Sequence, residues 1–362
     1  MLDNLVDLPG RIRRAYRRWS VDSRLDRLNS WFDRREPGDA GGQAYDHAET
    51  VRDYYDLCHE FMEFGWGESL HFAPLVPGET LEDAVVRHQR LMIRKLELKE
   101  GMRVVDVGCG VGGPMRRVAR EAGVTVVGVN NNEYQLAQAK SKNVEAGVDH
   151  MAEYVRCDFM DMGVLEANAF DAAYAIESTC HAPDKQGAFA EIYRLLKPGA
   201  LFWGQEMCLT NAFDPSDPNH VSIKGELMRG IALNHIASFE EVDRALEAVG
   251  FEVVGAADLG ASGGPTASWW GPMESRNGSF GNFILRTPWG RRAMGMAIRL
   301  AETARVFPRN SHKVIRFMDR TADAYVHGAK AGIFTPLYCF LARKPVARPA
   351  KAEHPPGENA TG

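Results

Sequence analysis

The residues most suited to chemistry form a glycine-rich segment at 104–117, VVDVGCGVGGPMRR. A β-branched run, typical of a buried strand, ends at Asp106. Gly108, Gly110 and Gly112 follow at alternate positions, and a helical pattern begins after the next proline. Glycine lets a backbone turn tightly and approach a ligand, and the N-terminus of a helix favours a negative group. The segment therefore predicts a strand–loop–helix nucleotide pocket. A tight turn that only packs is the alternative.

The spacing D-V-G-C-G-x-G-G, which starts at Asp106, resembles the cofactor loop of class I S-adenosylmethionine (SAM) methyltransferases. The resemblance implies that SAM is the cofactor. Its methionine part would lie against the backbone of Gly108, Cys109, Gly110 and Gly112, with Asp106 near the first turn.

The elements around this loop predict a doubly wound α/β fold. From 101 to 255, expected strands and helices alternate, which is typical of a mostly parallel sheet with right-handed crossovers. We expect a Rossmann-like sheet of seven strands, a helical N-terminal segment and a C-terminal insertion before the last strand. The expected strands are 104–108, 124–130, 152–159, 170–177, 200–206, 251–259 and 337–345, and the expected helices are 114–122, 133–146, 184–196 and 238–249.

In such a sheet, ligands bind beyond the carboxyl ends of the strands. The second strand ends at Asn130 and Asn131, with Gln135 shortly after. Asn130 can donate and accept hydrogen bonds, so it can hold ribose hydroxyls where most SAM sites place an acid. A plain loop of turn residues is the alternative. After the third strand, Asp158 can accept from the adenine amine while Phe159 packs on its ring.

Composition narrows the class of protein. The chain has 362 residues, 45% of them hydrophobic and 25% charged, as in a soluble globular protein. Its net charge of −5 offers no basic field for nucleic acid. Six cysteines without a C-x-x-C pair, and no metal-ligand spacing, predict reduced thiols in a cytosolic protein and no metal site. The N-terminus does not resemble a signal peptide, and no apolar run approaches the ~20 residues of a membrane span. A homo-oligomer is compatible with the sequence.

The N-terminal segment contains a basic cluster with interleaved apolar residues, among them Arg11, Ile12 and Tyr16. It predicts either a helix packed on the main domain or a helix on a membrane surface. The expected organisation is a basic helical segment and linker (1–42), a helical, aromatic-rich substrate cap (43–100), a SAM-binding domain (101–259), a C-terminal substrate-binding segment (260–345) and a disordered tail (346–362).

Further motifs resemble the sterol C-24 methyltransferase family over about residues 50–345. They are YYDLCHEFMEFGWGESLHFAP (54–74), VGVNNNEYQLAQAK (127–140), AIESTCHAPDK (175–185) and IFTPLYCFLARKP (333–345). The resemblance implies SAM-dependent methyl transfer to the side-chain double bond of a sterol. Gln205-Glu206-Met207 replaces a usual Tyr-Glu-Trp, and Met62 and Phe64 replace usual tyrosines. These departures leave open another isoprenoid or lipid alkene as acceptor. A sterol carrier on a SAM fold is the non-enzymatic alternative.

Methyl addition to an alkene leaves a carbocation, which needs a dry site, aromatic faces and a base. Phe64 and Trp66 are candidates to stabilise the cation, together with Phe61 and Phe72, although all four can equally form a core stripe. The candidate bases are Glu177 and His181, which follow the fourth strand, and Glu63, Glu68, His71 and Glu206. Glu177, which lies next to the expected methyl group, is also a candidate for cofactor binding.

Overall fold

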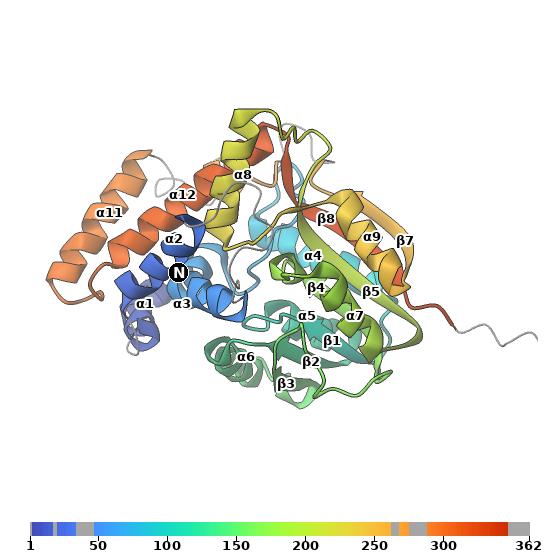
Figure 1. Cartoon of the computed structure of the whole chain (residues 1–362). Helices are drawn as coiled ribbons and strands as arrows, with labels where there is room; N and C mark the ends of the chain where they lie inside the picture. Colours follow the sequence, from blue (N-terminus) through green and yellow to red (C-terminus); the bar gives the residue numbers. More distant parts are fainter. Residues whose placement is uncertain (1, 17–19, 34–46, 262–267, 275–287, 347–362) are drawn as a thin grey trace, which may run out of the picture.

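The computed structural model describes residues 2–16, 20–33, 47–261, 268–274 and 288–346. Its centre is one twisted sheet with the strand order β3-β2-β1-β4-β5-β8-β7 (Figure 1). Strands β1 to β5 are parallel, whereas β8 runs antiparallel to both β5 and β7. The strands are β1 (Arg103–Val107), β2 (Thr125–Asn130), β3 (Ala152–Arg156), β4 (Phe170–Ile176), β5 (Leu196–Leu209), β6 (Ala237–Ser238), β7 (Glu252–Asp258) and β8 (Phe334–Arg343).

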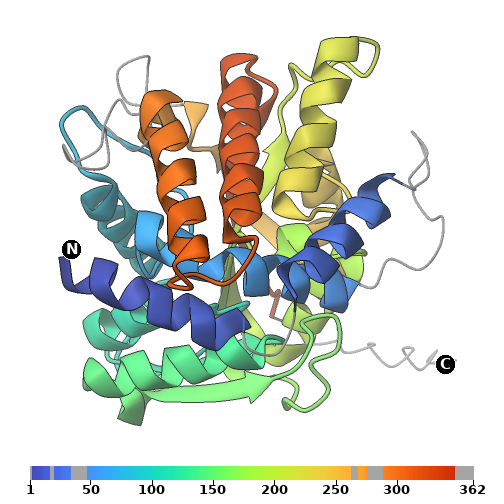
Figure 2. The same ribbon diagram turned by 90° about the vertical axis from the view of Figure 1, so that its left-hand side faces the viewer.

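Helices cover the sheet and build a second layer at its carboxyl edge. Helices α8, α11 and α12 stand side by side there, and α1 passes beneath them (Figure 2). The helices are α1 (Leu2–Ala15), α2 (Val21–Asp33), α3 (His47–Trp66), α4 (Leu81–Lys95), α5 (Gly113–Ala122), α6 (Glu133–Glu145), α7 (Lys185–Leu195), α8 (Pro218–Ile231), α9 (Phe239–Val249), α11 (Pro288–Thr303) and α12 (Ser311–Lys330).

Two apolar cores hold the sheet. On one face, Phe189 of α7 and Val242 of α9 pack against the strands with no exposed surface. On the other face, Met92 of α4 and Met115 of α5 do the same. Each such side chain stabilises the fold by about 1.5–3 kcal/mol through its removal from water. The carboxyl edge is thereby held rigidly as a platform for ligands.

The fold class is confirmed. All seven expected strands are present, with the very short β6 in addition, and the four expected helices are α5, α6, α7 and α9. The two helices of the expected substrate cap lie in different places. Helix α3 covers the carboxyl edge of the sheet, whereas α4 packs on one face of the sheet through Met92. Helix α8, which no motif marked, packs against α12.

The N-terminal helix packs on the protein. Ile12 and Tyr16 are buried with Leu57 and Phe61 of α3, and Arg11 pairs with Glu60 at 2.7 Å. The expected linker, residues 347–362 of the expected tail and the basic residues 17 and 18 lie outside the described residues. Within the described ranges, no helix combines the length and apolar composition that crossing a bilayer requires.

Candidate active site

Two cavities meet at the carboxyl edge of the sheet. The first, which we call the cofactor cavity, is lined by the glycine loop and by the residues that follow β2 and β4. The second, which we call the acceptor cavity, has a volume of about 250 Å³ and lies among α3, α11 and α12. Four residues line both cavities and therefore mark the junction: Tyr55, Leu70, His71 and Glu177.

The glycine loop forms the floor of the cofactor cavity, and each position needs glycine for a different structural reason. Gly110 has a φ of +53° and open space where a Cβ would be, so its backbone faces the cavity directly. Gly108 has a φ of +86°, and a Cβ there would lie 2.3 Å from the Cβ of Ser178. Gly112 immediately precedes α5 as its N-cap and lies against Ala139, outside the cavity lining. The loop therefore fits a ligand held against the backbone, as SAM requires.

Polar groups after β2 form the far wall of the cofactor cavity. Asn130 and Gln135 both line it, and Asn130 Nδ2 donates to Gln135 Oε1 at 2.9 Å. Asn131 also lines the cavity, as do Cys109 and Phe159. Asp158, which we expected near the adenine, is not among the lining residues, and its carboxylate accepts from Met160 N at 2.9 Å.

Asp106 places a buried carboxyl group in the cofactor cavity. Burial raises its pKa to about 7, although the Tyr174 hydroxyl, which donates to it at 2.9 Å, lowers the pKa in part. A carboxyl group in this state gains most from a cationic ligand, which favours its ionised form. SAM carries such charge at its sulfonium and ammonium groups.

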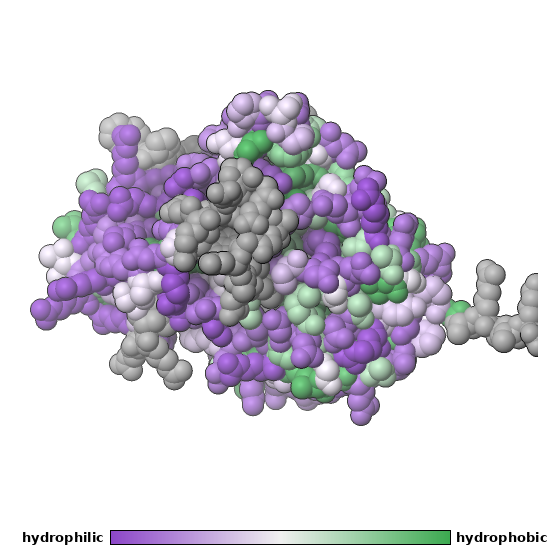
Figure 3. Space-filling view, in the orientation of Figure 1, coloured by the Kyte–Doolittle hydropathy of each residue, from purple (hydrophilic) through white to green (hydrophobic). Residues whose placement is uncertain are grey.

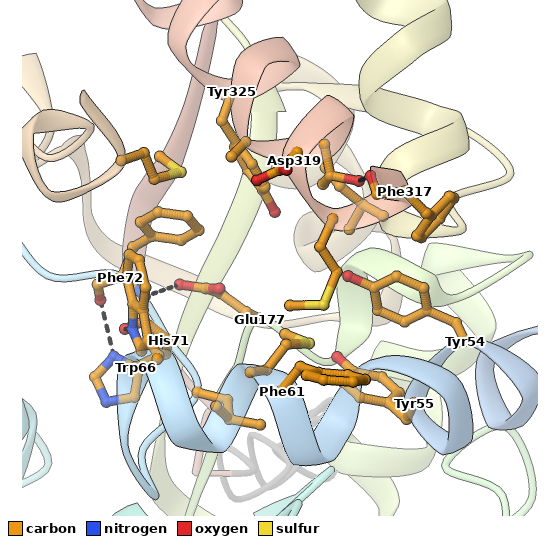
Figure 4. A pocket seen from close by; sticks show the side chains of 18 of the residues that line it. Tyr54, Tyr55, Phe61, Trp66, His71, Phe72, Glu177, Phe317, Asp319 and Tyr325 are labelled. Carbon is orange, nitrogen blue, oxygen red and sulfur yellow. Dashed lines mark hydrogen bonds between the residues drawn. The ribbon is translucent and has the colours of Figure 1, made fainter. Parts of the chain in front are cut away.

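The acceptor cavity is mainly aromatic and sulfur-containing (Figure 4). Trp66 and Phe72 stand edge to face with ring centroids 5.0 Å apart, and Phe72 contacts Tyr325 at the same distance. Such a lining excludes water and presents π faces to a positive charge. The aromatic lining residues are Tyr54, Tyr55, Phe61, Trp66, Phe72, Phe317 and Tyr325.

Trp66 is fixed at the end of α3 by the turn that follows it. Gly67 has a φ of +97°, and its N–H bonds to the Glu63 carbonyl at 2.8 Å, a typical helix end. Trp66 Nε1 donates to the His71 carbonyl at 3.0 Å. The indole is thereby held against the cavity, whereas Phe64 lines neither cavity and packs with the α1–α3 core.

Glu177 is the carboxylate at the junction, and it is buried. Its φ of +52° is unusual for a residue with a side chain and costs of order 1–3 kcal/mol, a strain that clusters at functional sites. The Phe72 N–H donates to Glu177 Oε1 at 2.6 Å (Figure 4). Burial raises the pKa of Glu177 to about 8, while this N–H and the Gln205 amide lower it in part.

A chain of hydrogen bonds orients Glu177 from behind. Gln205 Nε2 donates to Glu177 Oε1 at 2.6 Å, and Gln205 Oε1 contacts His88 Nε2 at 2.7 Å. Because an amide oxygen only accepts, His88 carries its hydrogen on Nε2. Burial lowers the pKa of His88 to about 4, so the imidazole is neutral. Gln205 thus fixes the carboxylate from the position where the family usually has tyrosine.

His71 also lies at the junction, but its two nitrogens are engaged. Nδ1 contacts the Phe72 carbonyl at 2.8 Å and therefore donates, and Nε2 contacts Gln89 Nε2 at 2.9 Å and therefore accepts. Burial lowers the pKa of His71 to about 3. The arrangement holds a neutral ring in place and leaves it little capacity to take a proton.

None of the remaining candidate bases lines both cavities. His181 lines only the cofactor cavity, where Nε2 lies 3.4 Å from the Tyr55 hydroxyl. Glu68 lines the same cavity and pairs with Lys142 at 2.7 Å. Glu63 pairs with Lys142 and Glu206 with Lys185, and neither carboxylate lines the described cavities. Glu177 is the carboxylate common to both sites.

Several lining residues were not predicted. Tyr55 lies seven residues before Met62, a spacing that places both on one face of α3, so helical periodicity could have identified it. Arg291 and Asp319 line the acceptor cavity from α11 and α12, and no local motif marks either position.

Family models match both parts of the chain. Residues 105–204 match a methyltransferase domain, and residues 282–346 match the sterol methyltransferase C-terminal family. Among solved structures, a mycolic acid cyclopropane synthase is similar with a TM-score of 0.65 and 17% identity, covering 83% of this chain and all of the other. A geranyl diphosphate C-methyltransferase from Streptomyces coelicolor has a TM-score of 0.57 and 18% identity, covering 84% of this chain and all of the other. These two likenesses show the shared fold.

Sequence relatives are closer. The cycloartenol-C-24-methyltransferase of Arabidopsis thaliana is 44% identical over 299 residues, which are 83% of this chain and 88% of the relative. The sterol 24-C-methyltransferase of Saccharomyces cerevisiae is 34% identical over 324 residues, which are 88% of this chain and 84% of the relative. With this identity extending over most of its length, the chain belongs to the family of SAM-dependent sterol C-24 methyltransferases.

Proposed function

We propose that this enzyme transfers the methyl group of SAM to carbon 24 of a sterol whose side chain has a double bond there. The observation that carries the proposal is the junction at Tyr55, Leu70, His71 and Glu177, where the cofactor and acceptor cavities meet. Holding two reactants in contact supplies much of the acceleration when the nucleophile is a neutral alkene.

The junction suits the charge that methyl addition creates. SAM supplies an electrophilic methyl group, and its addition to the alkene leaves a positive charge on the neighbouring carbon of the sterol. Trp66 and Phe72 offer π faces, each worth about 0.5–2 kcal/mol to a cation. Glu177 is placed to stabilise the charge and to take the proton whose loss ends the reaction.

Product analysis tests the proposal. Purified enzyme is incubated with methyl-labelled SAM and a panel of Δ24 sterols, and we expect label in a sterol enlarged by one carbon. Label only in an acyclic triterpene or an unsaturated acyl chain would instead support another lipid alkene as acceptor. SAM binding without transfer to any acceptor would support a carrier.

The proposal includes transient contact with a membrane, because sterols reside there. Support comes from α11, where Met296 and Leu300 are 62% and 71% exposed beside the exposed Arg292 and Arg299. Apolar patches lie among hydrophilic residues at that end of the molecule (Figure 3). Exposed apolar and basic side chains on one helix are typical of interfacial binding.

The double variant M296E/L300E tests this contact. It should bind anionic vesicles more weakly, yet turn over detergent-solubilised sterol normally. Unchanged co-sedimentation would exclude this surface.

A further inference from the structure

Besides Glu177, the described lining of the acceptor cavity contains two charged side chains, Arg291 of α11 and Asp319 of α12. Neither lines the cofactor cavity. The remaining lining is dominated by aromatic residues, methionines and aliphatic residues. The acceptor cavity therefore has charged side chains in two places: Glu177 at the methyl-transfer junction, and the pair Arg291 and Asp319 on α11 and α12.

The geometry of this pair leaves Asp319 available. Arg291 Nη1 makes its short contact, 2.7 Å, to Asp323, one turn further along α12. Arg291 Nε lies 3.7 Å from Asp319 Oδ1, beyond a hydrogen bond. The described residues supply no hydrogen bond to the Asp319 carboxylate, whose side chain is 35% exposed. The tie between α11 and α12 is thus made by Asp323, and Asp319 faces the cavity (Figure 4).

We propose that Asp319 and Arg291 form a subsite for the ring hydroxyl of the sterol, at the other end of the substrate from its reacting side chain. The inference rests on the proposed function. A hydroxyl group can donate to the Asp319 carboxylate and accept from the Arg291 guanidinium. The ring hydroxyl is the one polar group of such a sterol. This subsite would therefore supply the hydrogen-bond partners that the sterol needs in an otherwise apolar cavity.

The environment strengthens such a hydrogen bond. Burial and the neighbouring Asp323 raise the pKa of Asp319 above its usual value, although Arg291 lowers it in part. A partly buried carboxyl group has less water to lose than a fully exposed one when a hydroxyl binds, and the bond is stronger there than in bulk water.

The test compares one Δ24 sterol with its 3-deoxy counterpart, in turnover and in binding followed by tryptophan fluorescence. In the natural protein we expect kcat/KM for the hydroxylated sterol to be about tenfold higher or more, as for a hydrogen bond to a charged group. The variant Asp319→Leu should lose that advantage and treat the 3-deoxy sterol as before. Asp319→Asn, which keeps an acceptor, should retain part of it.

Glu226→Leu is the matched control, because it removes a carboxylate that pairs with an arginine of α12, Arg320, and neither of these residues lines the acceptor cavity. It should preserve the preference for the hydroxylated sterol. Equal handling of the two sterols by the natural protein would overturn the subsite, as would equal losses on both sterols in Asp319→Leu. Failure to methylate any sterol would refute the proposed function instead, and the binding preference would still decide whether the subsite exists.

Discussion

The cofactor cavity and the acceptor cavity are built in different ways. The cofactor cavity is defined largely by backbone, since Gly108 and Gly110 adopt positive φ values in a loop between one strand and one helix. The acceptor cavity is defined by side chains from helices far apart in the chain, from Tyr54 on α3 to Tyr325 on α12. A backbone-built site tolerates few changes, whereas a side-chain-built site can change its lining and hence its substrate.

Glu177 belongs to both cavities. Its position at the end of β4 belongs to the sheet, but its carboxylate is held by groups from both halves. The Phe72 N–H comes from the segment after α3, and the Gln205 amide comes from β5. The comparison therefore predicts that changes to Glu177 affect transfer, while changes to the loop affect cofactor binding.

The largest effect is expected for Glu177→Gln. Removing the charge while keeping the shape should lower turnover about 10²–10⁴-fold, the usual range for a positioned acid–base group. SAM affinity should fall less than turnover, because the carboxylate meets the charge of SAM in the ground state, whereas the charge on the sterol appears only after transfer begins. Single-turnover kinetics and calorimetry separate the two. The rival base is His181, and a larger loss in His181→Ala than in Glu177→Gln would contradict the assignment.

The next largest effect is expected for Gly110→Val. A β-branched residue is strained at a φ of +53°, and its side chain would occupy the space that the cavity offers to SAM. SAM affinity should fall by a factor on the order of 100, or about 2.7 kcal/mol. The control is Gly255→Val in β7, where the glycine has open surroundings and no positive φ. Near-normal SAM affinity in a folded Gly110→Val protein would remove this loop from the site.

The same difference between the cavities explains what the sequence revealed. The glycine loop and the strand ends were predicted because their function is local: a turn, a helix start and a ligand lie within a dozen residues. Asn130, Gln135 and Phe159 accordingly line the cofactor cavity. Asp158 and Gly112 are the exceptions, since the Asp158 carboxylate bonds to the turn that follows it and Gly112 lies against Ala139, outside the lining.

The acceptor side was predicted less completely, for a physical reason. The side chain at 64 faces the α1–α3 core and the one at 66 faces the cavity, and only tertiary packing distinguishes these faces. The positive φ of Glu177 and the bond from Gln205 to it depend on how β4 and β5 lie together. Asp319 becomes a lining residue only after α12 packs near α3, and no spacing in the sequence shows this.

Trp66 should give an intermediate effect. Trp66→Leu removes a π face and the donor to the His71 carbonyl, so turnover should fall roughly 2- to 30-fold, as expected for one lost cation–π contact. Trp66→Phe keeps a π face and should lose less. Product analysis should also detect a changed mixture in Trp66→Leu, because a less well-held cation can lose a different proton. Equal losses in both variants would mean that the indole N–H or the size of the ring, and not its π face, explains the role of the residue.

The smallest expected effect is a release of protons when SAM binds. In the ligand-free protein the pKa values of Glu177 and Asp106 are raised to about 8 and about 7, so both carboxyl groups are partly or mostly protonated at pH 7. A bound cation favours the ionised form of each and lowers both pKa values. Protons should therefore leave on binding at pH 7, and the release should fade above pH 8, where both groups are already ionised.

Calorimetry in buffers with different ionisation enthalpies measures this release, since the observed heat then varies with the buffer. Glu177→Gln should reduce the number of protons released, and the remainder should belong to Asp106 and disappear in Asp106→Asn combined with it. If Glu177→Gln leaves the release unchanged, the Glu177 carboxylate does not sense the cofactor's charge. The carboxylate would then lie too far from the methyl donor to act as the base. His181, which lines only the cofactor cavity, would become the better candidate.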